Sequence, residues 1–86
     1  MKRKGSKVIM TENAVENYGE KYRDVVFVIT HVSRSEQDHP GYDSCVGENL
    51  YDLKFAESNI EFGSSLYEYE VNSFIGDVYP QQKRGD

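Results

Sequence analysis

The densest group of chemically active side chains in this sequence is the polar stretch Asp38-His39-Pro40-Gly41-Tyr42-Asp43-Ser44-Cys45. Together with His31, it offers the imidazole, thiolate and carboxylate groups that bind zinc in proteins. The spacing matches no standard zinc site, because the chain has one cysteine and no paired Cys motif. Asp and Pro-Gly are also ordinary turn residues. We therefore predict no metal site and no cofactor.

Nucleophilic and acid–base chemistry are the other possibilities that the side chains offer. A pair of Cys45 and His39 would need a rigid pocket, an oxyanion hole and an orienting third group, and a glycine-containing loop in an 86-residue chain is a poor host for them. Glu68 and Glu70 alternate along a predicted strand, which fits a solvated face better than a carboxylate pair with separated pKa values. No Gly-rich phosphate motif is present. The sequence predicts a protein that is not an enzyme.

Charge is divided unevenly along the chain. The net charge is −5, yet residues 1–10 hold four basic side chains and no acid, whereas residues 11–79 hold fourteen acids and four basic side chains. An acidic body repels the phosphates of nucleic acid and attracts basic protein surfaces. We therefore predict a protein partner with a basic surface. Binding of nucleic acid through the basic arm is the alternative.

Tyrosine dominates the aromatic residues, with seven copies and no tryptophan. Tyr is favoured at interfaces because it contributes a large contact area at low entropic cost. Tyr51 and Tyr69 are predicted to lie in the core. The predicted partner-binding site is a partly exposed aromatic surface rimmed by acids, made of Tyr18, Tyr22, Glu36, Asp38, Tyr42, Asp43, Glu48 and Tyr67. The alternative is that these tyrosines only cover a small core.

Short β-strands are the elements that must position these residues. Apolar and alternating runs predict strands at residues 7–11, 25–32, 50–55, 60–62 and 66–71, the third and fourth forming a hairpin and Gly63-Ser64-Ser65 breaking the pattern. Thr11 or Asn13 caps a short helical turn that ends at Tyr18-Gly19. Residues 35–49 are predicted to form a long loop, and residues 72–79 fit a short helix weakened by Gly76.

Consecutive short antiparallel strands remove their free edges by curling into a small barrel. The order of elements resembles an SH3-like barrel: a first strand, an irregular excursion, a strong central strand, a hairpin, then a turn and a closing strand. The amino-acid sequence of residues 7–71 resembles the sequences of small uncharacterised proteins of bacteriophages and mobile elements. The segments that carry this resemblance are KVIMT (7–11), NYGEKYR (17–23), VITHV (28–32), HPGYD (39–43), LYDL (50–53) and SLYEYEV (65–71).

This resemblance implies a mostly-β fold, a small SH3-like barrel of four to five antiparallel strands with one long loop and at most short helical turns. The related proteins usually carry Gly where this chain has Asp24 or Phe27. The resemblance supplies no catalytic residues. We predict a disordered basic arm at residues 1–6, the barrel at residues 7–71, and a C-terminal extension and tail at residues 72–86.

Together these patterns predict a non-enzymatic phage or mobile-element protein that binds a host or phage protein. A sharper version is inhibition through mimicry of nucleic acid, since residues 36–70 hold nine acids against Lys54 alone. The alternatives are an SH3-like nucleic-acid-binding domain and a small metal-binding protein. A single cysteine and the lack of a 20-residue apolar run predict the host bacterial cytoplasm and no membrane contact. The chain is expected to be a monomer, or a weak homodimer paired through an exposed edge strand.

Overall fold

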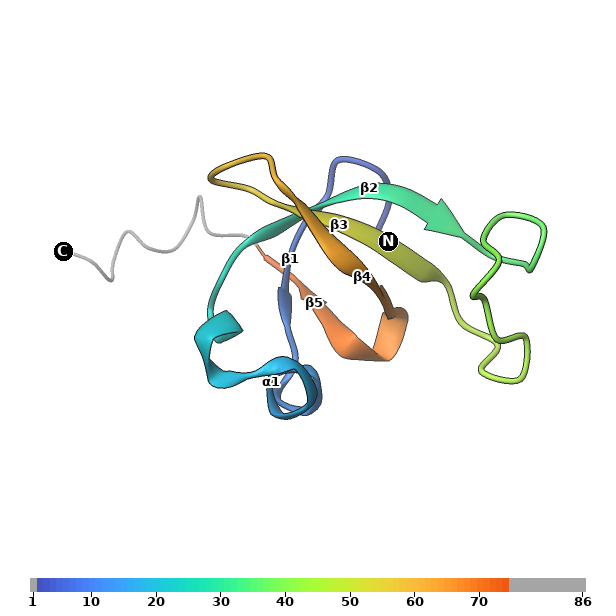
Figure 1. The fold of residues 1–86 in the computed structure, drawn as a ribbon, viewed down its shortest axis with the longest axis horizontal. Helices are drawn as coiled ribbons and strands as arrows, with labels where there is room; N and C mark the ends of the chain where they lie inside the picture. The colour runs from blue at the N-terminus through green and yellow to red at the C-terminus, as the bar shows by residue number, and fades with distance from the viewer. Residues whose placement is uncertain (1, 75–86) are drawn as a thin grey trace, which may run out of the picture.

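The protein is described by a computed structural model over residues 2–74. Its elements are β1 (Lys7–Met10), α1 (Glu12–Tyr18), the 3-10 helix η1 (Glu20–Tyr22), β2 (Phe27–Ser33), β3 (Leu50–Phe55), β4 (Glu61–Tyr67), the 3-10 helix η2 (Glu68–Glu70) and β5 (Val71–Ser73). The strands form one antiparallel sheet in the order β4-β3-β2-β1-β5 (Figure 1). The predicted mostly-β fold of antiparallel strands with one long loop is confirmed.

The core is built from the buried positions of all five strands and from α1. Val8 and Met10 share the buried face of β1, as the alternation predicts. Thr11 caps α1 by accepting a hydrogen bond from the Ala14 N–H (3.3 Å), which confirms the predicted helix start. The fully or nearly buried apolar side chains are Val8, Met10, Ala14, Val15, Phe27, Ile29, Tyr51, Leu53, Leu66 and Val71. None of the helices within residues 2–74 is long and apolar enough to cross a membrane.

The central strand begins two residues later than predicted, at Phe27. Asp24 adopts a left-handed conformation with φ of 62°, and the Val25 N–H turns back to the Tyr22 carbonyl (3.2 Å). The chain therefore makes a tight bend before it enters the sheet. Gly is the residue that adopts positive φ without steric cost, so the backbone at this position would also suit Gly.

Replacing Asp24 tests this bend. A left-handed conformation costs an L-residue roughly 1–2 kcal/mol, less for Asp and Asn, and Gly loses about 0.5–1 kcal/mol of backbone entropy on folding. Asp24→Gly is therefore expected to change the free energy of unfolding by less than about 1 kcal/mol, and Asp24→Val to lower it by about 1–2 kcal/mol. Urea unfolding measures both changes. A Val variant as stable as the parent would contradict the left-handed bend.

The second half of the hairpin differs from the prediction. β4 continues without a break through Gly63-Ser64-Ser65 and ends at Tyr67, where a strand had been predicted to run on to Val71. The chain turns there because the Glu70 carboxylate accepts a hydrogen bond from the Tyr67 N–H (2.9 Å) and so closes η2. The prediction that Glu68 and Glu70 share a solvated strand face is wrong. Glu70 is buried, and Glu68 belongs to the same 3-10 turn.

The N-terminal segment is held against the sheet. The Gly5 N–H donates to the Ile29 carbonyl (2.8 Å), and the Ile29 N–H donates to the Ser6 carbonyl (2.9 Å). Lys2 Nζ lies 2.6 Å from the Glu68 carboxylate. Gly5 and Ser6 therefore extend the pairing of β1 with β2, and Lys2 is tied to η2, which differs from the predicted disordered arm.

The start of the predicted C-terminal extension belongs to the sheet. Asn72 and Ser73 lie in β5 and pair with β1, and the Phe74 N–H donates to the Lys7 carbonyl (2.9 Å). This differs from the predicted helix over residues 72–79. The rest of that predicted helix and the predicted tail lie outside the described residues.

Candidate functional site

The long loop, residues 34–49, is fixed against the end of β4. Tyr42 is buried, and its ring centroid lies 6.1 Å from that of Tyr67. The Asp43 N–H donates to the Tyr67 hydroxyl (2.8 Å), and the Asp43 carboxylate accepts from the Cys45 N–H (2.9 Å). These contacts bring Tyr42 and Asp43, two members of the predicted binding surface, to the junction of β4 and η2.

At this junction an exposed aromatic surface is formed. Tyr69 stacks on Tyr67 with ring centroids 6.3 Å apart and an interplanar angle of 10°, and Tyr69 is 53% exposed. The Tyr69 N–H donates to Glu48 Oε1 (3.0 Å), so a carboxylate lies beside the stacked rings. We call this surface the tyrosine patch, and it consists of Asp43, Glu48, Tyr67 and Tyr69. Tyr42, which was predicted to be partly exposed, is buried and packs against Tyr67.

Tyr69 is the member of the patch that sequence analysis missed. The alternation of Tyr67, Tyr69 and Val71 predicted a strand with Tyr69 in the core, and that prediction is wrong. The available signal was Glu70, because a Glu at the third position of a turn can accept from the backbone N–H that begins it, although Tyr67 stands where Ser or Thr is usual. In the structure the Glu70 carboxylate accepts from the Tyr67 N–H.

Tyr18 and Tyr22 lie in a different group of rings. The Phe62 ring centroid is 5.8 Å from Tyr18 and 5.2 Å from Tyr22, with Phe27 and Phe55 adjoining. Burial raises the pKa of the Tyr18 hydroxyl, and the nearby Glu70 carboxylate adds to this rise. Both tyrosines are half-buried and pack against the core. This placement matches the alternative in which these two rings cover the core.

Glu36 and Asp38 lie at the beginning of the long loop and are exposed. The Asp38 carboxylate accepts a hydrogen bond from the Arg34 N–H (3.0 Å), and the Asp38 N–H donates to the Ser35 carbonyl (3.0 Å). Asp38 therefore closes the turn that starts the loop. Glu36 lies within the same turn and presents its charge to solvent.

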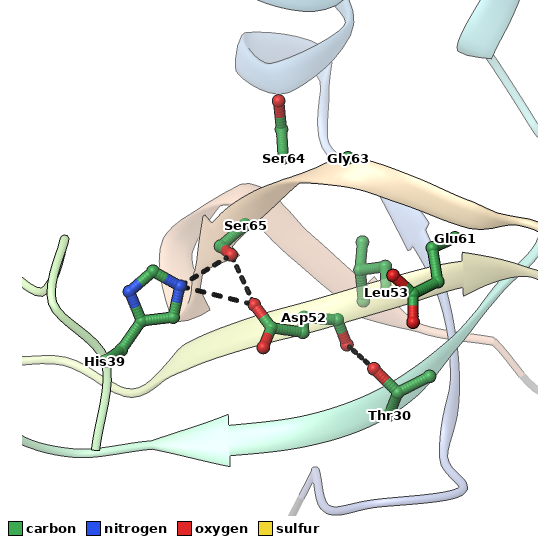
Figure 2. A pocket seen from close by; sticks show the side chains of 8 residues that line it. All are labelled: Thr30, His39, Asp52, Leu53, Glu61, Gly63, Ser64 and Ser65. Carbon is green, nitrogen blue, oxygen red and sulfur yellow. Dashed lines mark hydrogen bonds and ion pairs between the residues drawn. The ribbon is translucent and has the colours of Figure 1, made fainter.

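A polar pocket of about 270 Å³ lies on β3 where the pairing with both neighbouring strands is irregular. The register shifts between Ile29 and His31 on the β2 side, and between Asp52 and Lys54 on the β4 side. Such bulges bend strands locally and redirect their side chains. We call it the Asp52 pocket, and Figure 2 shows its lining residues: Thr30, His39, Asp52, Leu53, Glu61, Gly63, Ser64 and Ser65.

Within this pocket a serine, a histidine and an aspartate meet. Ser65 Oγ lies 3.2 Å from His39 Nε2 and donates to Asp52 Oδ1, and His39 Nε2 lies 3.5 Å from the same Asp52 oxygen (Figure 2). The Gly41 N–H donates to His39 Nδ1 (3.0 Å), which assigns the proton of the neutral ring to Nε2. A histidine that activates serine needs a bare nitrogen facing the hydroxyl. The network therefore orients Asp52 and does not activate Ser65.

The residues considered for metal binding or nucleophilic chemistry lie in three separate places. His39 belongs to the Asp52 pocket, His31 is exposed on β2, and Cys45 is exposed in the long loop. Across residues 2–74, no three His, Cys, Asp or Glu side chains are grouped so that they could hold a metal ion.

Comparison with known proteins identified no relative of this chain. No family model, curated protein or solved structure matches this chain. The tyrosine patch and the Asp52 pocket are therefore interpreted from their own geometry.

The η2 turn beneath the patch is anchored by Glu68. Burial opposes ionisation of this carboxyl, but hydrogen bonds from Lys2 and Tyr51 outweigh burial and hold the pKa of Glu68 below its ordinary value of 4.5. Burial, followed by the hydrogen bond to Glu68, raises the pKa of the Tyr51 hydroxyl. Ionised Glu68 thus ties the N-terminal segment and β3 to the turn that carries Tyr69.

A pH-dependent contribution to stability follows from this anchor. Because the pKa of Glu68 is lowered by folding, its contribution is present above pH 4.5 and is lost as the pH falls through the lowered value. Glu68→Gln is expected to lower the free energy of unfolding by about 1 kcal/mol or less at pH 7, since the side chain is partly exposed. Parent and variant should converge in acid. Urea unfolding at several pH values measures this, with Glu57→Gln as the exposed control. An unchanged difference between parent and variant from pH 7 to pH 3 would contradict it.

Proposed function

We propose that this chain is a non-enzymatic protein of phage or mobile-element origin that binds a basic surface of another protein through the tyrosine patch. The observation that carries the proposal is the exposed Tyr69 stacked on Tyr67, with Glu48 bound to the Tyr69 N–H and Asp43 bound to the Tyr67 hydroxyl. Stacked aromatic rings offer contact area that is already ordered, and anchors of this kind dominate the binding energy of interfaces. The adjacent carboxylates favour a partner that presents Lys or Arg.

The SH3-like interpretation of the fold remains part of this proposal. It is supported by the strand order β4-β3-β2-β1-β5, by α1 in the excursion between β1 and β2, and by the 3-10 helix that precedes the closing strand. In such barrels an aromatic surface lies between the first excursion and the loop that follows the central strand. Here the loop after β2 contributes Asp43 and Glu48 to this surface, and its buried Tyr42 packs against Tyr67.

Ordinary docking is favoured over mimicry of nucleic acid because several of the nine acids between residues 36 and 70 are engaged internally. Glu70 is buried and closes η2, Glu68 pairs with Lys2, and Asp52 accepts from Ser65. A mimic would need these charges in a continuous exposed stripe. The nucleic-acid-binding alternative is also weakened, since Lys2 of the basic segment is paired with Glu68.

Selection from a displayed library of random peptides tests the proposal. The full-length chain is expected to enrich sequences that contain Lys or Arg, and their binding should weaken as salt is raised, because charges at an interface rim are screened. Failure to enrich any peptide, or enrichment of acidic peptides, would overturn the proposal. A gel shift with duplex DNA and single-stranded RNA at physiological salt tests the alternative, and a stable shifted complex would favour nucleic-acid binding.

A further inference from the structure

The Asp52 pocket combines two carboxylates with a lining that contains no Lys or Arg. Asp52 and Glu61 come from neighbouring strands and lie on the same side of the sheet (Figure 2). None of the eight lining residues is Lys or Arg. Lys54 is the cross-strand neighbour of Glu61 and is not among the lining residues. The pocket therefore presents two carboxylates to whatever enters it.

The Asp52 carboxylate is held in place and remains accessible. Its Oδ1 atom accepts from Ser65 and lies near His39 Nε2, and the side chain is 37% exposed. None of the hydrogen bonds described within residues 2–74 uses its second oxygen, Oδ2. A ligand can therefore bind a carboxylate whose orientation is already set, which reduces the entropic cost of binding.

The size of the pocket limits what it can hold. A volume of about 270 Å³ is below the roughly 300–1,000 Å³ that is typical of pockets for drug-sized ligands, so a single side chain is the better fit. A guanidinium group presents five N–H donors in a planar fork. It can therefore donate to two carboxylates that lie on different sides of it. The Thr30 hydroxyl at the wall donates to the Asp52 carbonyl and can still accept a hydrogen bond from a ligand.

The pocket adjoins the tyrosine patch. Ser65 and Tyr67 are two residues apart on β4, about 7 Å along a strand, and alternation places them on the same face. His39 and Asp43 both lie in the long loop, which contributes to both sites. One partner could therefore place an anchor on Tyr69 and an adjacent side chain in the pocket.

We propose that the Asp52 pocket binds the guanidinium group of an arginine side chain that the protein partner presents next to the tyrosine patch. This inference rests on the proposed function, and it names the chemistry by which a basic partner is recognised. Lysine is expected to bind less well, because its ammonium group is a compact charge that cannot donate to both carboxylates in a fixed plane.

Titration of the full-length chain with Nα-acetyl-arginine methylamide, followed by NMR, tests the inference directly. Saturable shifts are expected at His39, Glu61 and Ser65, and the neutral citrulline analogue of the same shape should not produce them. Glu61→Gln removes a charge from an exposed side chain that no described hydrogen bond uses, and it should weaken binding about tenfold. Glu57→Gln makes the same change in the same hairpin outside the pocket, and it should leave binding unaltered.

The outcomes separate this inference from the proposed function. Equal shifts with arginine and citrulline, or equal effects of the two Glu→Gln variants, would overturn the inference. If peptides selected by the chain bind through Tyr69 and tolerate replacement of each Arg by citrulline, the inference fails and the proposed function stands. If the arginine derivative saturates the pocket while no peptide is selected, the proposed function fails. The inference that the pocket binds a guanidinium group then stands.

Discussion

Phe27→Ala is expected to remove a large part of the stability of this domain. Phe27 is completely buried, and its ring centroid lies 5.0 Å from that of Phe55 and 5.1 Å from that of Phe62. Truncating a buried Phe to Ala costs about 3–5 kcal/mol, because apolar contact is lost and a cavity remains. A folded chain of this length has a total stability of about 4–13 kcal/mol. Urea unfolding followed by circular dichroism measures the change.

Two further variants make the Phe27 result specific. Phe27→Leu keeps most of the buried volume and should cost only about 1–1.5 kcal/mol. Ile60→Ala removes a side chain that is 64% exposed in the β3–β4 turn, and it should change stability by less than about 0.5 kcal/mol. If Phe27→Ala were no more destabilising than Ile60→Ala, the aromatic core described here would be incorrect.

Tyr69→Ala is expected to produce the largest loss of binding. The side chain is the most exposed of the stacked rings and makes its ring contact with Tyr67. Removal of an aromatic anchor from an interface typically costs about 2 kcal/mol or more, which is about a thirtyfold weaker affinity. We expect this change for the basic peptides that the parent chain selects, measured by fluorescence anisotropy. The free energy of unfolding should change by less than about 0.5 kcal/mol.

Matched variants separate the patch from general surface effects. Tyr69→Phe keeps the ring and should retain most of the affinity. Ile60→Ala removes the other large apolar side chain that is exposed within residues 2–74, which lies beyond the opposite end of β4, about 20 Å away along the strand. If Ile60→Ala and Tyr69→Ala weakened peptide binding equally, the tyrosine patch would not be the docking site.

Prediction of local structure from the sequence was most reliable where neighbouring residues decide the structure. The buried pair Val8 and Met10, the cap at Thr11 and the hairpin of β3 and β4 follow from alternation and capping chemistry, and all three are confirmed. It failed at Tyr69, because the pattern Tyr67-Glu68-Tyr69-Glu70-Val71 alternates like a strand. Local alternation cannot reveal that a carboxylate will fold back on the turn.

By itself, the sequence determined the first three strands, the long loop and the acidic, tyrosine-rich composition, since these depend on composition and on short-range periodicity. Only the tertiary structure decided which side chains meet in the two sites. Ser65 reaches Asp52 thirteen positions away and His39 twenty-six positions away. Such contacts depend on strand register and on bulges at two strand pairs, because a shift of one residue sends each side chain to the opposite face.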